Sequence, residues 1–268
     1  MEELLNQIMQ ELGTDNRGLV IAYLIVCALI LIMSIVTLVM EIIVWIRYSR
    51  ANRKPISNQM TGIEAARYVL DREGLYDVNV RQAGFIREAI FGNYYNIMTK
   101  TIYLRSIFGK IDLRRSVTST ALAVQKAALA KLCESGDKSA RIRNTLSLIG
   151  IFGPFLFMPV VIIGMIVDLM ILHTGGWLSA ICLAVSGLFV IMGFVVTMLN
   201  IPVEKRANEE ALRLMEKHGM ANQEELRTIA KVYNAYIISY ICDFILEILR
   251  MVQWILEIII KSKSKNKD

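Results

Sequence analysis

Three long runs of residues without a charged side chain limit what this chain can fold into more than any other feature. The runs cover residues 19–40, 144–167 and 174–203. About 20 apolar residues allow a helix to cross the hydrocarbon core of a bilayer. The core helix of a soluble protein can be equally apolar, but three runs of this length in a chain that is 55% hydrophobic favour membrane-spanning helices.

The charges on either side of the first run predict its orientation. Residues 1–18 hold four acidic side chains and one basic side chain, whereas residues 47–54 hold four basic side chains and no acidic one. Cation-rich flanks of a spanning helix stay in the cytoplasm, so the leader is expected outside. Its lack of positive charge favours a retained anchor over a cleaved signal peptide. We expect the basic cluster to contact lipid headgroups and no nucleic acid.

Together these patterns predict an α-helical membrane protein with a small cytoplasmic α+β domain, located in the cell membrane as a multi-pass protein. The expected segments are an external leader (1–18), a first transmembrane helix (19–46), the cytoplasmic α+β domain (47–143), a second and a third transmembrane helix (145–172 and 177–203), cytoplasmic helices (204–232), an amphipathic C-terminal helix (233–260) and a basic tail (261–268).

Local patterns predict the first elements of the soluble domain. Thr61 followed by Glu64 has the spacing of a capping box at the start of a helix. The alternation in residues 76–82 and the Tyr, Ile and Thr content of residues 94–105 predict short strands. Residues 84–92 fit neither a helix pattern nor a strand pattern clearly.

The segment 117–134 predicts a single helix around which the soluble domain is organised. Ala, Leu, Lys and Gln dominate it, and all are good helix formers. Leu122, Leu129 and Leu132, with Ala between them, predict one continuous apolar face.

Four blocks of sequence around this helix resemble a known family. They are Thr-Gly-Ile-Glu-Ala-Ala at 61–66, Gly-Leu-Tyr-Asp-Val at 74–78, Thr-Lys-Thr-Ile-Tyr-Leu at 99–104 and Ile-Pro-Val-Glu at 201–204. In this order they are similar to the small bacterial membrane zinc metallopeptidases of the YugP type. The resemblance implies a gluzincin-like membrane peptidase architecture.

The resemblance also implies which residues stand at the family's zinc site. In that family the central helix carries His-Glu-x-x-His, whose two His hold zinc while the Glu acts as general base. The matching positions here are Gln125, Lys126 and Leu129, and only Glu204, at the position of the third ligand, keeps a ligand side chain. The chain therefore looks like a degenerate member that lacks the motif. A second departure lies at residues 93–97, Asn-Tyr-Tyr-Asn-Ile, where the family has D-H-Y-D-P.

These substitutions predict that the chain is not an enzyme and holds no metal or other cofactor. One carboxylate cannot hold a catalytic zinc ion, which needs about three protein ligands. His173 is expected on the opposite side of the membrane, and His218 is the only conceivable replacement ligand. Ser116 and Ser119 share the helix with Lys126, but a Ser119–Lys126 catalytic pair is not expected because two helical turns, roughly 11 Å, separate the two residues.

The loss of the metal predicts a new partner for Glu204, because a buried carboxylate without a counter-charge is costly. Lys126 and Lys205 are the nearest basic residues in the sequence. We expect one of them to form an ion pair with Glu204 where the metal would stand.

Segment 233–260 is amphipathic rather than uniformly apolar. Its polar stripe consists of Asp243, Glu247, Arg250, Gln253 and Glu257. Charged side chains inside a bilayer are costly, so the stripe is expected to face protein or water. An in-plane helix is preferred over a fourth span, since it keeps the lysine-rich tail in the cytoplasm.

Three functional hypotheses follow from the sequence. The preferred one is a catalytically inactive homologue of a membrane zinc metallopeptidase, which acts by binding as a scaffold or regulator. Its expected partners are the lipid bilayer and an active peptidase relative or another membrane protein. The alternatives are a structural or lipid-associated membrane protein, and a zinc metallopeptidase that uses a non-standard site.

Overall fold

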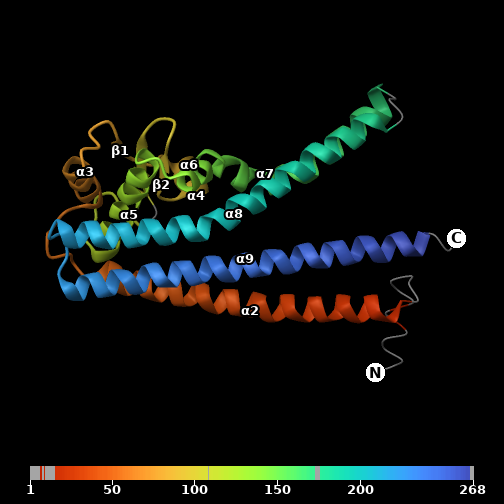
Figure 1. Ribbon diagram of the computed structural model, residues 1–268, viewed down its shortest axis with the longest axis horizontal. Coiled ribbons are helices and arrows are strands. Elements are labelled where there is room, and N and C mark those ends of the chain that lie inside the picture. Colours follow the sequence, from red (N-terminus) through yellow and green to blue (C-terminus); the bar gives the residue numbers. More distant parts are fainter. Residues whose placement is uncertain (1–6, 8, 10–15, 108, 173–175, 266–268) are drawn as a thin grey trace. The chain divides into compact units, whose positions relative to one another are not determined.

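The computed structural model describes residues 7, 9, 16–107, 109–172 and 176–265. Most of the leader, the loop residue His173 and the last tail residues, 266–268, lie outside this part of the chain. The helices are α2 (Arg17–Arg53), α3 (Gly62–Arg72), α4 (Phe85–Phe91), α5 (Val117–Glu134), α6 (Lys138–Thr145), α7 (Ser147–Val167), α8 (Trp177–Lys217) and α9 (Gln223–Lys265), and the strands are β1 (Asn79–Gln82), β2 (Tyr94–Asn96) and β3 (Thr101–Leu104). The structure is thus mostly helical with one small sheet (Figure 1).

The chain divides into two compact units. One comprises residues 1–46 together with 238–268, and the other comprises residues 47–237. The helices α2 and α9 each contribute one part to either unit. We refer to the first as the helical-pair unit and to the second as the α+β unit.

The sheet of the α+β unit has three strands in the order β1-β3-β2. Strand β1 pairs with β3 in parallel, and β2 pairs with β3 antiparallel. The strand expected in residues 76–82 is confirmed over its second half, and residues 94–105 form two strands. Residues 84–92, which were ambiguous in the sequence, contain the short helix α4.

Helix α5 is the centre of the α+β unit. Its bounds, Val117–Glu134, are those expected from the sequence, and it packs against α3 and α8. The expectation of a single apolar face was wrong, because α5 is buried on nearly every side while Leu122 and Leu132 are only partly buried. Its many Ala residues are fully buried, and their small side chains allow neighbouring elements to approach from several directions.

The start of α3 confirms the predicted capping box. The amide of Glu64 donates to Thr61 Oγ1 at 3.3 Å, and the amide of Thr61 donates to Glu64 Oε2 at 2.8 Å. Gly62, the first residue of α3, lies against the backbone of the loop before α5, where a Cβ atom would stand 2.0 Å from the carbonyl oxygen of Ile111. Only glycine fits this position.

Helices α7 and α8 form an antiparallel hairpin within the same unit. A π-helical turn, Asp168–Leu172, extends α7. The carboxylate of Asp168 accepts hydrogen bonds from the amide and the hydroxyl of Ser179, at 3.0 and 2.9 Å, and so ties the end of α7 to the first turn of α8. Helix α8 then continues without interruption through Pro202 and brings Glu204 to the side of α5.

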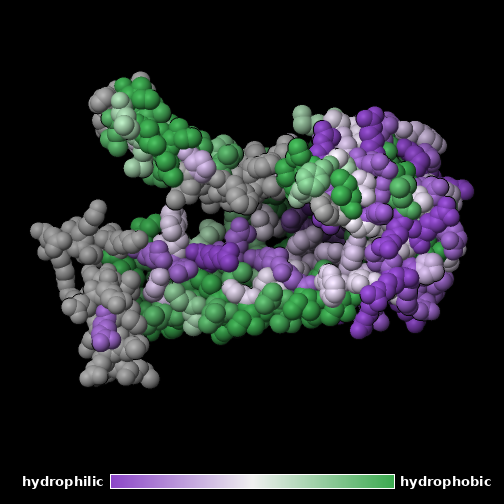
Figure 2. All heavy atoms as spheres, turned by 180° about the vertical axis from the view of Figure 1, so that it is seen from behind, coloured by the Kyte–Doolittle hydropathy of each residue, from purple (hydrophilic) through white to green (hydrophobic). Residues whose placement is uncertain are grey.

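Two helices in the described part of the chain, α2 and α8, are long and apolar enough to cross a membrane. A third apolar stretch, Pro159–Ile171, is shorter. Figure 2 shows that the surface over much of α2 is apolar, and large hydrophobic side chains such as Leu31 and Leu38 are more than half exposed there. Exposed apolar surface of this extent needs an apolar environment or a partner.

Helix α9 joins two segments that were expected to be separate, the end of the cytoplasmic helices (204–232) and the amphipathic C-terminal helix (233–260). It runs without a break over 43 residues. No glycine or proline occurs between residues 223 and 265, so nothing in the sequence ends the first helix before the second begins.

Candidate functional site

The three residues at the motif positions of α5 lie in the interior of the α+β unit. Gln125 and Lys126 are 7% and 8% exposed, and Leu129 is fully buried. Helix α8 places Glu204, which is 2% exposed, beside them, and α6 contributes Arg143. The structure therefore brings Gln125, Lys126 and Glu204 together and adds Arg143, while Leu129 lies one turn after Gln125 on α5.

The carboxylate of Glu204 is surrounded by N–H donors. Gln125 Nε2 donates to Glu204 Oε2 at 2.5 Å, and Arg143 Nη2 donates to Glu204 Oε1 at 2.7 Å. Lys126 Nζ lies 3.4 Å from the same Oε1 atom. One anionic side chain is thus shared by two cationic side chains and one amide.

Two asparagines of α8 hold these donors in position. Gln125 Nε2 also donates to Asn208 Oδ1 at 2.8 Å, and Arg143 Nε donates to Asn200 Oδ1 at 2.7 Å. Asn200, Glu204 and Asn208 are spaced four residues apart, so they lie on one face of α8. We call Gln125, Lys126, Arg143, Glu204 and these two asparagines the Glu204 cluster.

Glu204 and Lys126, the ion pair expected from the sequence, influence each other's pKa. Burial, the largest single influence on Glu204, acts to raise its pKa, but the charges of Lys126 and Arg143 outweigh it and the pKa is lowered. Burial also lowers the pKa of Lys126, and Arg143 acts in the same direction, against the attraction of Glu204. Glu204 is therefore held as a carboxylate by its neighbours rather than by water.

The prediction that Lys126 pairs with Glu204 is confirmed, and the alternative, Lys205, was wrong. Lys205 is exposed and lies 4.0 Å from Glu209 on the surface of α8. The closer cation, Arg143, was missed. It lies 61 residues before Glu204 and has no spacing relation to the motif helix, so no sequence signal linked the two.

These residues do not fit the zinc ion that the resemblance implies. Zinc needs lone pairs from Cys, His, Asp or Glu, and here both carboxylate oxygens face N–H groups. A divalent cation at this point would also be repelled by Lys126 and Arg143. Among the residues described here, no group of three or more His, Cys, Asp or Glu side chains is arranged to hold a metal.

The other candidate side chains are engaged elsewhere. His218 lies 14 residues beyond Glu204 on the chain, roughly 21 Å along α8, and its Nε2 contacts Glu73 Oε1 at 2.8 Å. Ser119 Oγ donates to the carbonyl oxygen of Ile111 at 2.5 Å, and Ser116 Oγ accepts from the amide of Ser119 and caps α5. These seryl groups serve the backbone and are not paired with Lys126.

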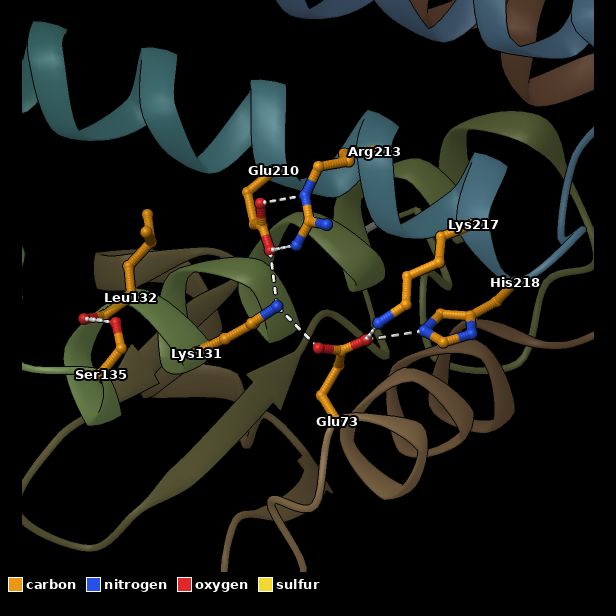
Figure 3. Close-up of polar contacts among 8 residues, drawn as sticks. All are labelled: Glu73, Lys131, Leu132, Ser135, Glu210, Arg213, Lys217 and His218. Carbon is orange, nitrogen blue, oxygen red and sulfur yellow. Dashed lines mark hydrogen bonds and ion pairs between the residues drawn. The ribbon is translucent and has the colours of Figure 1, made fainter.

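His218 belongs to a second polar cluster, which joins the ends of α3, α5 and α8 (Figure 3). Lys131 Nζ lies between Glu73 and Glu210, at 2.6 and 2.8 Å from their oxygens, and Lys217 Nζ lies 2.7 Å from Glu73. Burial acts to raise the pKa of Glu73, but the hydrogen bonds from Lys131, Lys217 and His218 together lower it to about 2.

This lowered pKa predicts a loss of stability in acid. Because the folded pKa of Glu73 lies below its ordinary value of 4.5, the stabilisation is present above that value and is lost as the pH falls towards about 2. Glu73→Gln should reduce the pH dependence of the melting temperature in this range. Glu209→Gln, which changes an exposed glutamate of α8, is the control. If the melting temperatures of the two variants fall equally as the pH is lowered below 4.5, the assignment to Glu73 is contradicted.

Comparison with known proteins gives one match. A family model described as "Putative neutral zinc metallopeptidase" matches residues 25–259. The matched range includes the Glu204 cluster as well as both polar and apolar parts of α8 and α9. No curated protein and no solved structure matches the chain.

Proposed function

The chain belongs to the neutral zinc metallopeptidase family, and from this premise we propose that it is a non-catalytic member that acts by binding, as a scaffold or regulator of other membrane proteins. The observation that carries this proposal is the set of donors and charges around the carboxylate of Glu204. Its two oxygens accept hydrogen bonds from Gln125 and Arg143, and Lys126 supplies a second positive charge.

A family member that cleaves peptides needs a metal to activate water, or an equivalent nucleophile. Gln125 and Leu129 offer no ligand lone pair suited to zinc, and Lys126 carries a proton where a general base would be needed. The surrounding fold is nevertheless intact, since α5 is complete and buried and α8 runs beside it. A complete, buried α5 together with these side chains supports a protein that acts by binding rather than by catalysis.

Elemental analysis of the full-length protein, purified in mild detergent without chelators, tests this proposal. We expect no stoichiometric zinc. Stoichiometric zinc that is lost in Glu204→Ala, but kept in Glu209→Ala, would overturn it and favour a peptidase with a non-standard site. Proteins that co-purify with the wild-type chain would distinguish a regulator from a purely structural or lipid-associated protein.

We also propose that the protein is a multi-pass protein of the cell membrane, with residues 47–143 and 204–232 in the cytoplasm. The basic residues 47–54 at the end of α2 support this orientation, because such clusters remain inside. The exposed apolar surface of α2 and the hydropathy of α8 support membrane crossing by both helices.

Contacts within the helical-pair unit support a fourth span in place of the in-plane helix. Tyr23 donates to Glu257 Oε1 at 3.0 Å, Gln253 Nε2 lies 3.6 Å from Cys27 Sγ, and the charge of Glu41 acts on Asp243. The contacting residue numbers rise along α2 as they fall along α9, so the helices are antiparallel.

The distance over which these contacts extend is close to the thickness of a membrane. Residues 23 to 41 of α2 cover roughly 27 Å at 1.5 Å per residue, compared with a hydrocarbon core of about 30 Å. If α2 crosses the membrane, α9 must cross beside it. The polar stripe of α9 lowers its hydropathy. Two residues of this stripe, Gln253 and Glu257, form hydrogen bonds with Tyr23 of α2.

Cysteine labelling from outside the cell tests this topology. In a chain without its four native cysteines, we expect Gly175→Cys and Ser264→Cys to react with a membrane-impermeant maleimide and Asn58→Cys to remain unlabelled. Reaction at 58 but not at 175 would reverse the orientation. Protection at 264 together with reaction at 175 would restore the in-plane arrangement of the C-terminal helix.

A further inference from the structure

The loop between β3 and α5 presents an unusual combination of side chains. Ile107 and Leu113 are 49% and 60% exposed, and between and beside them stand the exposed cations Lys110 and Arg114. Neither cation has a carboxylate partner in the described part of the chain. Together with Gly109 these residues line an open hollow of about 420 Å³.

This loop is held against the end of α2. A Cβ atom at Gly109 would stand 2.9 Å from the hydroxyl of Tyr48, and Gly109 has a φ of +95°, a backbone conformation that favours glycine. Burial raises the pKa of the Tyr48 hydroxyl, while the charges of Arg105 and Arg114 act in the opposite direction. Arg114 therefore lies close to this tyrosine.

Tyr48 marks the level of the membrane surface if α2 spans the bilayer. It follows the apolar part of α2 by a few residues, and Trp45, one turn earlier, is 68% exposed. Trp and Tyr gather where the hydrocarbon meets the headgroups. The loop that rests on Tyr48 is then at headgroup depth on the cytoplasmic side.

We propose that this loop is a binding site for an anionic phospholipid of the cytoplasmic leaflet, in which Lys110 and Arg114 bind the phosphate while Ile107 and Leu113 enter the acyl boundary. The inference rests on the proposed membrane arrangement of α2 and is independent of whether the Glu204 cluster binds metal. It gives the protein a lipid-dependent contact in addition to its spanning helices.

The apolar side chains distinguish this site from one for a soluble anion. Free phosphate would satisfy the two cations but would leave Ile107 and Leu113 in water. A lipid satisfies both halves of the surface at once, because its phosphate lies about where its acyl chains begin. Charge complementarity with an anionic leaflet adds attraction for each basic residue near the surface.

Environment-sensitive fluorescence in lipid nanodiscs tests the proposal on the full-length protein. The dye NBD is attached at Leu113→Cys in a chain without native cysteines, and the discs contain phosphatidylcholine alone or mixed with phosphatidylglycerol. We expect blue-shifted emission, and quenching by spin-labelled lipid, mainly in the discs with phosphatidylglycerol. K110Q together with R114Q should reduce the preference for anionic discs by about 25-fold, since each cation near an anionic surface contributes about fivefold.

The control label at Tyr76→Cys, an exposed site after α3, should respond to neither lipid. Equal spectra in both kinds of disc, or an unchanged response in the double variant, would overturn the headgroup site. Reversal of the shift by inorganic phosphate would assign the site to the free anion and overturn the lipid. Failure of the chain to enter nanodiscs at all would instead contradict the membrane arrangement on which the inference rests.

Discussion

Replacing Glu204 with alanine should lower the free energy of unfolding by about 3–5 kcal/mol, the cost of breaking a buried ion pair by removing one partner. The substitution leaves Lys126 and Arg143 buried without a counter-charge, and it leaves the amide of Gln125 with Asn208 alone. Thermal or denaturant unfolding of the purified protein in detergent measures the change. An enzyme site would predict a different result, in which metal content falls and stability changes with it.

A control and a rescue separate the charge effect from general damage to α8. Glu209→Ala, five residues further along the helix and exposed, should change stability by less than about 0.5 kcal/mol. Combining Glu204→Leu with Lys126→Met and Arg143→Met should recover much of the loss, because a buried ion cluster can often be replaced by apolar residues of similar volume. If Glu204→Ala behaves like Glu209→Ala, the cluster does not stabilise the fold.

Restoring the motif should recover only weak zinc binding unless Arg143 is also changed. Gln125→His, Lys126→Glu and Leu129→His supply the missing ligands and base on one face of α5. Arg143 would still occupy Glu204 Oε1 at 2.7 Å and would repel the metal. Adding Arg143→Gln should raise zinc affinity at least about tenfold, because removing a unit charge beside a divalent cation relieves more than about 1.4 kcal/mol of repulsion.

Calorimetric zinc titration of the triple and quadruple variants measures this difference. Arg141→Gln, in which an exposed arginine of the same helix is changed, is the matched control and should not improve the triple variant. Equal zinc affinity in the triple and quadruple variants would show that Arg143 does not obstruct the site. Failure of both to bind would indicate that the positions assigned from the resemblance are not a metal site.

The charges of the Glu204 cluster show how this carboxylate can stay buried without a metal ion. A zinc ion carries two positive charges, and Lys126 and Arg143 together carry the same formal charge. Each also donates a hydrogen bond to the carboxylate of Glu204. Together with the amide of Gln125, they direct N–H groups at both oxygens of the carboxylate.

Local sequence patterns were sufficient for several elements. The bounds of α5 and the capping box of Thr61 and Glu64 followed from residue preferences and spacing, because helix formation and capping involve neighbours within about four residues. The ion pair between Lys126 and Glu204 was also predictable, since the resemblance placed both residues at one site and burial demanded a partner. The all-round burial of α5 was not, because small Ala side chains do not reveal which neighbours approach them.

The sequence by itself determined the family, the apolar runs and the absence of metal-binding side chains at the motif positions, since all of these depend on the identity of residues. Only the tertiary structure decided that Arg143 completes the Glu204 cluster and that α9 lies antiparallel to α2 through Tyr23 and Glu257. These contacts join residues 61 and 234 positions apart. Such pairs form because packing brings their helices together. The periodicity of one helix indicates which of its faces is buried, but it does not identify the helix that covers that face.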